Sequence, residues 1–251
     1  MIESLLAQLR KLKLNGMASA LQTQREQPGT YEGLSFAERL QCLVDHEDLH
    51  RNQRKQERLT RAAHFKLKAQ AKDIDYQHAR GLQPSHIASL LMCDWIKKAQ
   101  NLLLTGPCGT GKTYVACALG QQACLKGFST QYYRLPRLIL ALTQAKADGS
   151  DSKLLKTIAS LDLLIIDDWG LEPLNAATRN DLMEIMDDRY ERSATIIISQ
   201  LPTERWYQAI GDNTLADAIL DRLMHNAHRM NLQGESMRKK MNSLTQVEHL
   251  E

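Results

Sequence analysis

The sequence predicts an α/β domain with a mostly parallel five-stranded sheet, preceded by a small all-helical domain. Leucines recur at helical spacing near the N-terminus, as at Leu5, Leu9 and Leu12, and the pattern resumes after a break at Pro28. Beyond residue 80, apolar runs alternate with helical stretches, which is typical of a parallel sheet with crossover helices. A length of 251 residues suits two domains, at roughly 150 residues per domain.

Gly81 and Pro84 mark the expected boundary between a helical domain over residues 1–80 and an α/β domain over residues 81–251. The strands of the second domain are expected at 101–104, 128–133, 163–167, 195–199 and 229–232. Its helices are expected between them, at 112–126, 135–147, 176–191 and 214–227. In this arrangement the glycine-rich and acidic motifs of the chain fall at the ends of strands.

The composition excludes several classes of protein. Hydrophobic residues make up 43% of the chain and charged residues 24%, which is not typical of disordered, collagen-like or membrane proteins. No run of about 18 apolar residues occurs, and the N-terminus lacks a secretion signal. None of the five cysteines forms a C-x-x-C pair, which favours reduced thiols. We therefore expect a cytoplasmic protein without membrane contact.

The segment GPCGTGKT, from Gly106 to Thr113, contains the pattern G-x-x-x-x-G-K-[ST] directly after an apolar strand and before a helix. Glycines let backbone N–H groups turn inward around phosphate oxygens, and the helix N-terminus adds positive potential. Lys112 is expected to reach the β and γ phosphates of ATP, and the Thr113 hydroxyl to bind Mg²⁺. The expected nucleotide contacts are Gly106, Pro107, Cys108, Gly109, Thr110, Gly111, Lys112, Thr113 and Tyr114. A chance glycine-rich turn is the alternative, and both flanks argue against it.

A second motif, LDLLIIDD, is an apolar strand that ends in two acids about 50 residues downstream. Asp167 is expected to hold Mg²⁺ through water. Asp168 then stands where a carboxylate could orient or deprotonate the attacking water, so we expect it to be catalytic. A helix cap or a solvated acid is the alternative for this residue, and it would be favoured in the absence of the glycine-rich motif.

Residues 51–72 form a basic segment, with eight Lys or Arg against one acid, Glu57. Five of the cations share one face of a helix: Arg51, Arg54, Lys55, Arg58 and Arg61. Such a stripe can follow the phosphate backbone of DNA, and a solvated helix face explains the pattern equally well. Because no base-reading motif is present, DNA binding through this stripe would be sensitive to salt and tolerant of sequence.

The motifs together resemble an AAA+ module. More closely, the segments GPCGTGKTYVACALG, LLIIDDWG, IIISQLP, DAILDRLMHNAHRMNL and GESMRK resemble the IstB-like helper ATPases of insertion-sequence transposition, which are related to the DnaC-type helicase loaders. The resemblance covers most of the chain. It implies a three-layer AAA+ P-loop domain and no C-terminal lid domain, since about 13 residues follow Arg238.

The resemblance also implies roles for single residues. Ser199 and Gln200 occupy the sensor 1 corner, where a polar side chain can contact the γ-phosphate or the lytic water. Arg222 lies where related proteins supply an arginine finger to the ATP of a neighbouring subunit. Arg238 is a weaker match to a second phosphate sensor. The alternative for Ser199 and Gln200 is an ordinary polar pair at a strand end, and the alternative for Arg222 is a surface salt bridge.

Two further expectations follow from the resemblance. Arg134 and Arg137 match the place where initiator-type AAA+ proteins insert an extra helix that contacts DNA, and a structural role is equally tenable. Many AAA+ proteins carry Glu where this chain has Asp168, and the shorter side chain would hold the water farther from the phosphate. Hydrolysis is therefore expected to be slow or stimulated by a partner.

The function expected from the resemblance is that of an ATP-dependent helper of DNA transposition. The protein would assemble on double-stranded DNA with ATP as a homo-oligomer, in a ring or a helical filament, and deliver the DNA to a transposase. Hydrolysis would then reset the complex. The alternatives are a DnaC-like loader of a replicative helicase, a small-molecule kinase, and a binding module that uses ATP only for structure.

Overall fold

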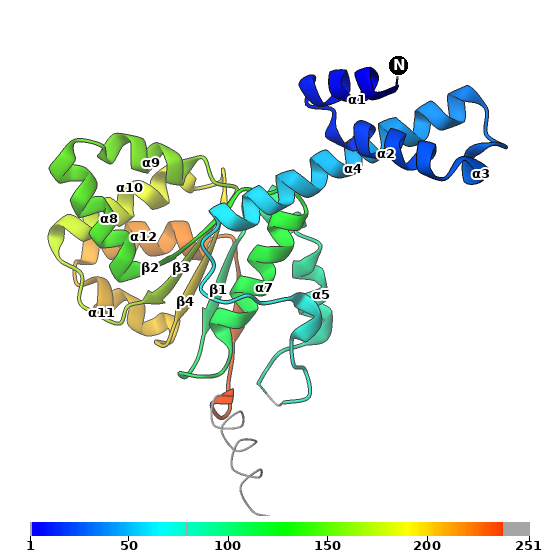
Figure 1. Cartoon of the computed structure of the whole chain (residues 1–251). Helices are drawn as coiled ribbons and strands as arrows, with labels where there is room; N and C mark the ends of the chain where they lie inside the picture. The colour runs from blue at the N-terminus through cyan, green and yellow to red at the C-terminus, as the bar shows by residue number, and fades with distance from the viewer. Residues whose placement is uncertain (1, 79, 238–251) are drawn as a thin grey trace, which may run out of the picture. The chain divides into compact units, whose positions relative to one another are not determined.

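The computed structural model describes residues 2–78 and 80–237, and these form two compact units that divide between Arg58 and Leu59 (Figure 1). The sequence had placed the boundary about twenty residues later, near residue 80. The segment between these points belongs to the second unit because its apolar side chains are buried there. The buried apolar side chains of this segment are Ala63, Ala69 and Ile74.

The first unit consists of helices that pack through a glycine and a buried acid. Its helices are α1 (Ile2–Lys11), α2 (Asn15–Glu26), α3 (Pro28–Tyr31) and the greater part of α4 (Phe36–Ala62). A Cβ atom at Gly16 would lie 2.7 Å from the Cα of Glu47, so only glycine permits this approach of α2 to α4. The Glu47 carboxylate accepts hydrogen bonds from the backbone N–H groups of Gly16, at 2.7 Å, and Met17, at 3.1 Å. These bonds satisfy donors in the first turn of α2, which have no partner within the helix.

The second unit is built on a five-stranded sheet in the order β2-β3-β4-β1-β5, and every pair of neighbouring strands is parallel. The strands are β1 (Asn101–Thr105), β2 (Thr130–Arg134), β3 (Leu163–Trp169), β4 (Ala194–Ser199) and β5 (Ala227–Asn231). All five had been expected, to within two residues at each end. The predicted α/β fold with a helical N-terminal region is therefore confirmed.

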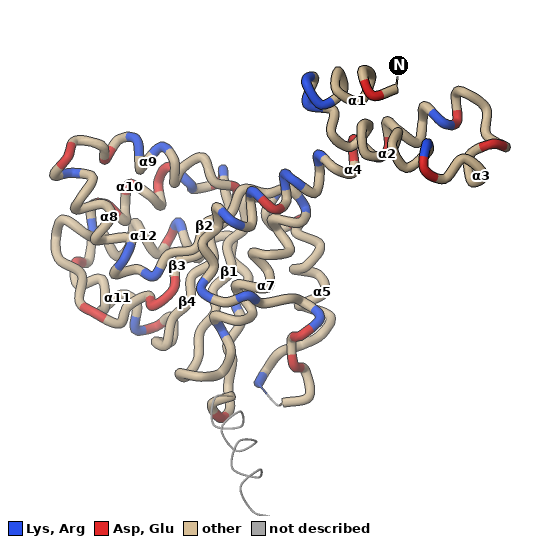
Figure 2. Tube along the Cα trace, in the orientation of Figure 1, with Lys and Arg blue, Asp and Glu red and all other residues tan. Residues whose placement is uncertain are grey.

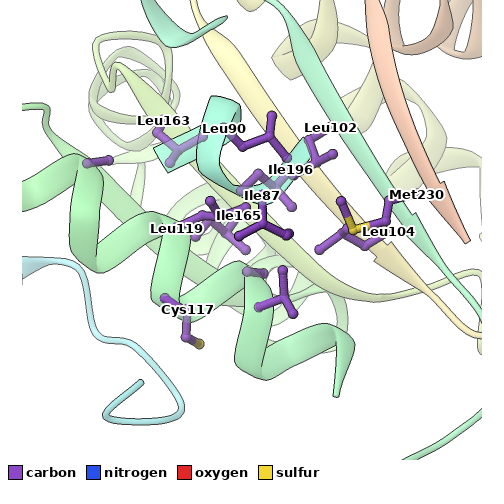
Figure 3. Close-up of a cluster of buried hydrophobic side chains, with 14 of the residues drawn as sticks. Ile87, Leu90, Leu102, Leu104, Cys117, Leu119, Leu163, Ile165, Ile196 and Met230 are labelled. Atoms are coloured by element: carbon purple, nitrogen blue, oxygen red, sulfur yellow. The ribbon is translucent and has the colours of Figure 1, made fainter. Parts of the chain in front are cut away.

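Successive residues of the strands point to opposite faces of the sheet, and both faces are covered by helices. Leu102, Ile165 and Ile196 pack on the face covered by α5 (Pro84–Leu91), α6 (Asp94–Lys97) and α7 (Lys112–Leu125), as Figure 3 shows for part of this cluster. Leu103 and Ile166 pack on the opposite face. That face is covered by α8 (Leu135–Asp148), α9 (Asp151–Ala159), α10 (Ala176–Arg189), α11 (Trp206–Ile210) and α12 (Asn213–Met224).

Two α-helices between the strands of the second unit, α9 and α11, had not been expected from the sequence. Helix α9 buries Leu155 and Ile158, and α11 buries Trp206 and Ile210. Both are short, with 9 and 5 residues, so they carry too few turns for a periodic pattern to be clear. In the part of the chain that the structure describes, no helix combines the length and apolar character needed to span a membrane.

Candidate nucleotide-binding site

The predicted phosphate residues meet at the edge of the sheet where β1, β3 and β4 end. A pocket of about 280 Å³ lies at this edge. Its lining includes ten residues that the sequence had assigned to nucleotide or metal binding or to catalysis: Cys108, Gly109, Gly111, Lys112, Thr113, Tyr114, Asp167, Asp168, Ser199 and Gln200. The fold therefore brings together the glycine-rich turn, the acidic strand end and the end of β4.

The glycines of the turn have a second use, which is to admit the segment that follows β5. Gly106, with φ +135°, lies so close to this segment that an added Cβ would be 2.0 Å from the carbonyl oxygen of Leu232. An added Cβ at Gly109 would be 2.1 Å from the Ser236 hydroxyl. The backbone N–H of Met237 donates to the Gly109 carbonyl at 2.9 Å. The segment that follows β5 thus packs against the glycine-rich turn and supports it, and only glycine permits this close approach.

Lys112 is folded back over the turn that it follows. Its ammonium group donates to the carbonyls of Gly106, at 2.6 Å, and Pro107, at 2.7 Å. The side chain is buried, and burial lowers the pKa of Lys112 from its usual value. The same carbonyl of Pro107 accepts from the Thr110 hydroxyl at 3.0 Å, so Thr110 shapes the loop from its buried position.

Asp167 connects the glycine turn to the sheet. This residue is only 3% exposed, and its Oδ2 atom accepts from the Thr113 hydroxyl at 2.9 Å and from the Tyr132 hydroxyl at 2.6 Å. The ammonium of Lys66 lies 3.8 Å from the same oxygen. Burial and the bond to Asp167 raise the pKa of Tyr132, so its hydroxyl remains a donor. Thr113 and Asp167 therefore present two oxygen ligands side by side.

Asp168 lies in an irregular part of β3. The register between β3 and β4 shifts between Ile166 and Trp169, and Asp168 has a φ of +64°. Such bulges redirect side chains next to functional sites, and aspartate tolerates this backbone region better than most residues. One carboxylate oxygen of Asp168 accepts from the Nε of Arg134 at 2.5 Å. Arg134 is thus tied to the nucleotide site within its own chain, although the sequence had suggested it as a DNA contact.

The two residues at the end of β4 differ in their surroundings. The Ser199 side chain is buried; its hydroxyl donates to the Trp169 carbonyl at 2.7 Å and accepts from the Leu201 N–H at 3.0 Å. These bonds occupy the hydroxyl in supporting the strand end. Gln200 is exposed and lines the pocket. Of the two residues that the resemblance assigned to sensor 1, Gln200 is the better placed to reach a phosphate or a water.

Arg222 lies at the opposite end of the sheet from the phosphate turn of its own chain. Asn101, the first residue of β1, donates to the backbone carbonyl of Arg222 at 3.2 Å, whereas the turn follows the last residue, Thr105. This strand separates the two regions by roughly 13 Å at about 3.3 Å per residue. The guanidinium donates to Asp187 from Nε, at 2.9 Å, and from Nη2, at 2.7 Å. Arg238, with the expected absence of a lid after it, lies outside the described residues.

The basic stripe lies on α4, where Figure 2 shows Lys and Arg along the C-terminal part of the helix. All five of its side chains are exposed, and so is Arg137 on α8.

Arg51 donates to Glu47 at 2.7 Å, so it also supports the acid that caps α2. Burial opposes the charged form of Glu47, but bonds from Arg51, Met17 and Gly16 hold its pKa below the usual value.

Among the residues at this site that the sequence had not identified are Tyr132, Lys66 and Arg80. Tyr132 is two residues before Arg134 on β2, and the alternation of a strand places both on the face that meets the acids of β3. That alternation was a usable signal. Lys66 had been counted only among the cations of the basic segment. The buried guanidinium of Arg80 donates to the Thr110 carbonyl at 3.0 Å, and nothing in its sequence surroundings indicates this contact.

Comparison with known proteins shows similarity along nearly the whole chain. Residues 7–245 match the family described as IstB-like ATP binding protein. A protein of Sinorhizobium fredii, named as an insertion sequence ATP-binding protein, is 46% identical over 234 residues, which cover 93% of this chain and 95% of the relative. A protein of the same kind from Pseudomonas fluorescens is 46% identical over 204 residues, covering 81% of this chain and 88% of the relative.

Solved structures with a similar fold include DnaI, with a TM-score of 0.56 and 18% identity over 67% of this chain and 90% of that one. The replication initiator DnaA bound to AMPPCP and single-stranded DNA has a TM-score of 0.55 and 16% identity, over 75% of this chain and 57% of that one. The DnaC helicase loader has a TM-score of 0.50 and 22% identity, over 59% and 86%. These likenesses confirm the predicted fold, an α/β domain built on a parallel five-stranded sheet.

The bond from Tyr132 to Asp167 generates a prediction. Tyr132→Phe removes one of two hydroxyl donors to Oδ2, so the carboxylate becomes free to rotate away from Thr113. We expect the Mg²⁺ concentration required for half-maximal binding of a fluorescent ATP analogue to rise about tenfold, as for other groups that orient metal ligands. Tyr133→Phe is the control, since Tyr133 packs against the opposite core. An unchanged Mg²⁺ requirement in Tyr132→Phe would contradict the orienting role.

Proposed function

Because this chain belongs to the family of IstB-like ATP binding proteins, we propose that it is an ATP-hydrolysing, DNA-binding helper of transposition. In this proposal it assembles with ATP on double-stranded DNA and delivers that DNA to the transposase of its element, and hydrolysis resets the complex. The observation that carries the proposal is that Lys112, Thr113 and Asp167 line one pocket. The names of the relatives, which are insertion sequence ATP-binding proteins, support the connection with transposition.

The oxygen donors at the pocket suit magnesium. Thr113 offers a hydroxyl and Asp167 a carboxylate, with 2.9 Å between the two oxygens. Among the described residues, no group of three or more His, Cys, Asp and Glu side chains could hold a metal alone. This suits an ion that takes one or two protein ligands and completes its shell with phosphate oxygens and waters. When bound, magnesium would offset the charge of the β and γ phosphates.

The protein groups around the phosphates would act by position and charge. Backbone N–H groups at the N-terminus of α7 bind phosphate oxygens, and Lys112 exchanges its carbonyl partners for them. Asp168 accepts a hydrogen bond from the attacking water through the oxygen that Arg134 does not occupy. Gln200 lies at the same pocket and can help to orient that water.

Two substitutions test the nucleotide chemistry. We expect Lys112→Ala to weaken ATP binding by about a hundredfold or more in calorimetry, because it removes the cation that meets the phosphates. We expect Asp168→Asn to bind ATP normally but to release phosphate about 10²- to 10⁴-fold more slowly, since the base is lost. Lys98→Ala, at an exposed position, is the control for both. Undiminished ATP binding by Lys112→Ala would refute the proposed site.

The basic stripe supports the proposal for DNA. Arg54, Lys55 and Arg58 are exposed, and none of them has an ion-pair partner in the part of the chain that the structure describes. Substituting all three with Gln should weaken binding to duplex DNA and lower the slope of log affinity against log salt by about 3, at roughly 0.9 per phosphate contact. Fluorescence anisotropy over a salt series measures both. Lys97 and Lys98, changed together to Gln, provide the control, and an unaltered slope in the triple variant would exclude α4 from the interface.

The position of Arg222 supports a site shared between subunits. Since it lies at the far end of the sheet from its own turn, it can serve phosphate only in a neighbouring chain that packs head to tail. We expect Arg222→Ala to lower phosphate release at least 10³-fold, as for other arginine fingers. Mixing it with Asp168→Asn should restore turnover, because each variant supplies what the other lacks. A mixture no more active than its components would indicate that Arg222 does not act on a neighbour.

A further inference from the structure

The segment of residues 63–70, here called the strap, leaves the end of α4 and passes along α7 (Figure 1). The strap is held in place at several points. The Tyr132 N–H donates to the Ala63 carbonyl at 2.9 Å. Phe65 packs so closely on α7 that a Cβ added to Gly120 would lie 2.6 Å from its ring. Ala63 and Ala69 are buried, so the backbone between them has a defined course.

Lys66 is the residue of the strap whose charge enters the nucleotide pocket. Its side chain lines the pocket with Lys112, Thr113 and Asp167. The Lys66 ammonium lies 3.8 Å from the Oδ2 atom of Asp167, which is the oxygen that accepts from Thr113. The side chain is 39% exposed, so it keeps freedom to move within the pocket. Lys68, two residues later, instead lines a separate cavity beside α7.

The neighbours of Lys66 indicate which part of a nucleotide it can reach. In a P-loop site the lysine and the following Thr serve the β and γ phosphates. Since Lys66 shares an oxygen of Asp167 with Thr113, its ammonium lies on the side of the pocket that receives these phosphates. A lysine is a compact cation on a flexible stem, so it can move from a carboxylate to a phosphate oxygen nearby.

We infer that Lys66 is a further phosphate-binding residue, which contacts the terminal phosphate of ATP when the nucleotide is bound. This inference rests on the proposed function, that is, on ATP and magnesium at this pocket. A divalent cation beside Asp167 would compete with the ammonium for that carboxylate. The terminal phosphate supplies the replacement partner, because its negative charge attracts the ammonium at close range. ADP lacks the terminal phosphate, so Lys66 distinguishes the two nucleotides.

A different role for Lys66 would be to neutralise Asp167 only while the pocket holds no metal. Removing the lysine would then leave ATP affinity unchanged or increase it, because the metal would meet no competitor. The two roles therefore predict opposite effects of the same substitution on ATP binding.

The test compares Lys66→Gln with Lys66→Arg, which keeps the charge, and with Lys68→Gln, which removes a neighbouring cation outside the pocket. Binding of fluorescent ATP and ADP analogues is measured at saturating Mg²⁺ on the full chain. We expect Lys66→Gln to weaken ATP binding about 10- to 100-fold, the usual effect of one hydrogen bond to a charged group. ADP affinity should change less than about twofold, and Lys66→Arg should recover most of the ATP affinity.

Several results would overturn the inference. These are unchanged or tighter ATP binding by Lys66→Gln, an equal loss for ATP and ADP, or an equal effect of Lys68→Gln. Lys112→Ala is measured in parallel so that the underlying site is tested separately. If Lys112→Ala loses ATP while Lys66→Gln does not, only the role of Lys66 fails. If the unaltered protein does not bind ATP, the proposed function fails with it.

Discussion

The carboxylate of Asp167 is the group on which the candidate nucleotide site depends. It is almost completely buried at the end of β3, and a buried charge is unfavourable unless hydrogen bonds or opposite charges surround it. Hydroxyls from α7 and β2 supply two of those bonds, and the backbone N–H of Asp168 supplies another at 2.8 Å. Segments far apart in the sequence therefore converge on one residue.

The geometry of the site therefore depends on the same packing that stabilises the sheet. A parallel sheet places the ends of its strands at one edge, and the sheet positions Asp167 there because the apolar residues before it are buried on both faces. The glycine turn reaches the same edge at the end of β1, and the segment after β5 supports it from behind. A substitution that alters the packing of β5 against β1 would thus change the position of the glycine turn, even if the substituted residue lies outside the candidate site.

The sequence predicted those parts of the molecule that local pattern determines. The strands, the helix after the glycine turn and the pairing of Thr113 with Asp167 follow from apolar runs and from a motif with fixed spacing. Contacts between distant segments that no sequence motif connects could not be predicted in the same way. The ion pair of Arg134 with Asp168 depends on the register of β2 against β3, which a single sequence does not show. Local composition indicated a boundary near Gly81, whereas tertiary burial of Ala63 and Ile74 moves it earlier.

The contact of Arg222 with Asp187 has a consequence for the energetics of self-association. Asp187 is 61% exposed. An ion pair with such an exposed partner contributes about 0–1 kcal/mol to stability. Giving up Asp187 alone is therefore inexpensive, although the guanidinium also donates to the Ala218 carbonyl at 3.0 Å and lies over the Tyr190 ring. In the proposed assembly, the Arg222 guanidinium would move to the phosphates of ATP on a neighbouring subunit, because these bind a cation more strongly than one solvated carboxylate does. The addition of a subunit to the proposed assembly would then depend on the nucleotide held by the subunit already in place.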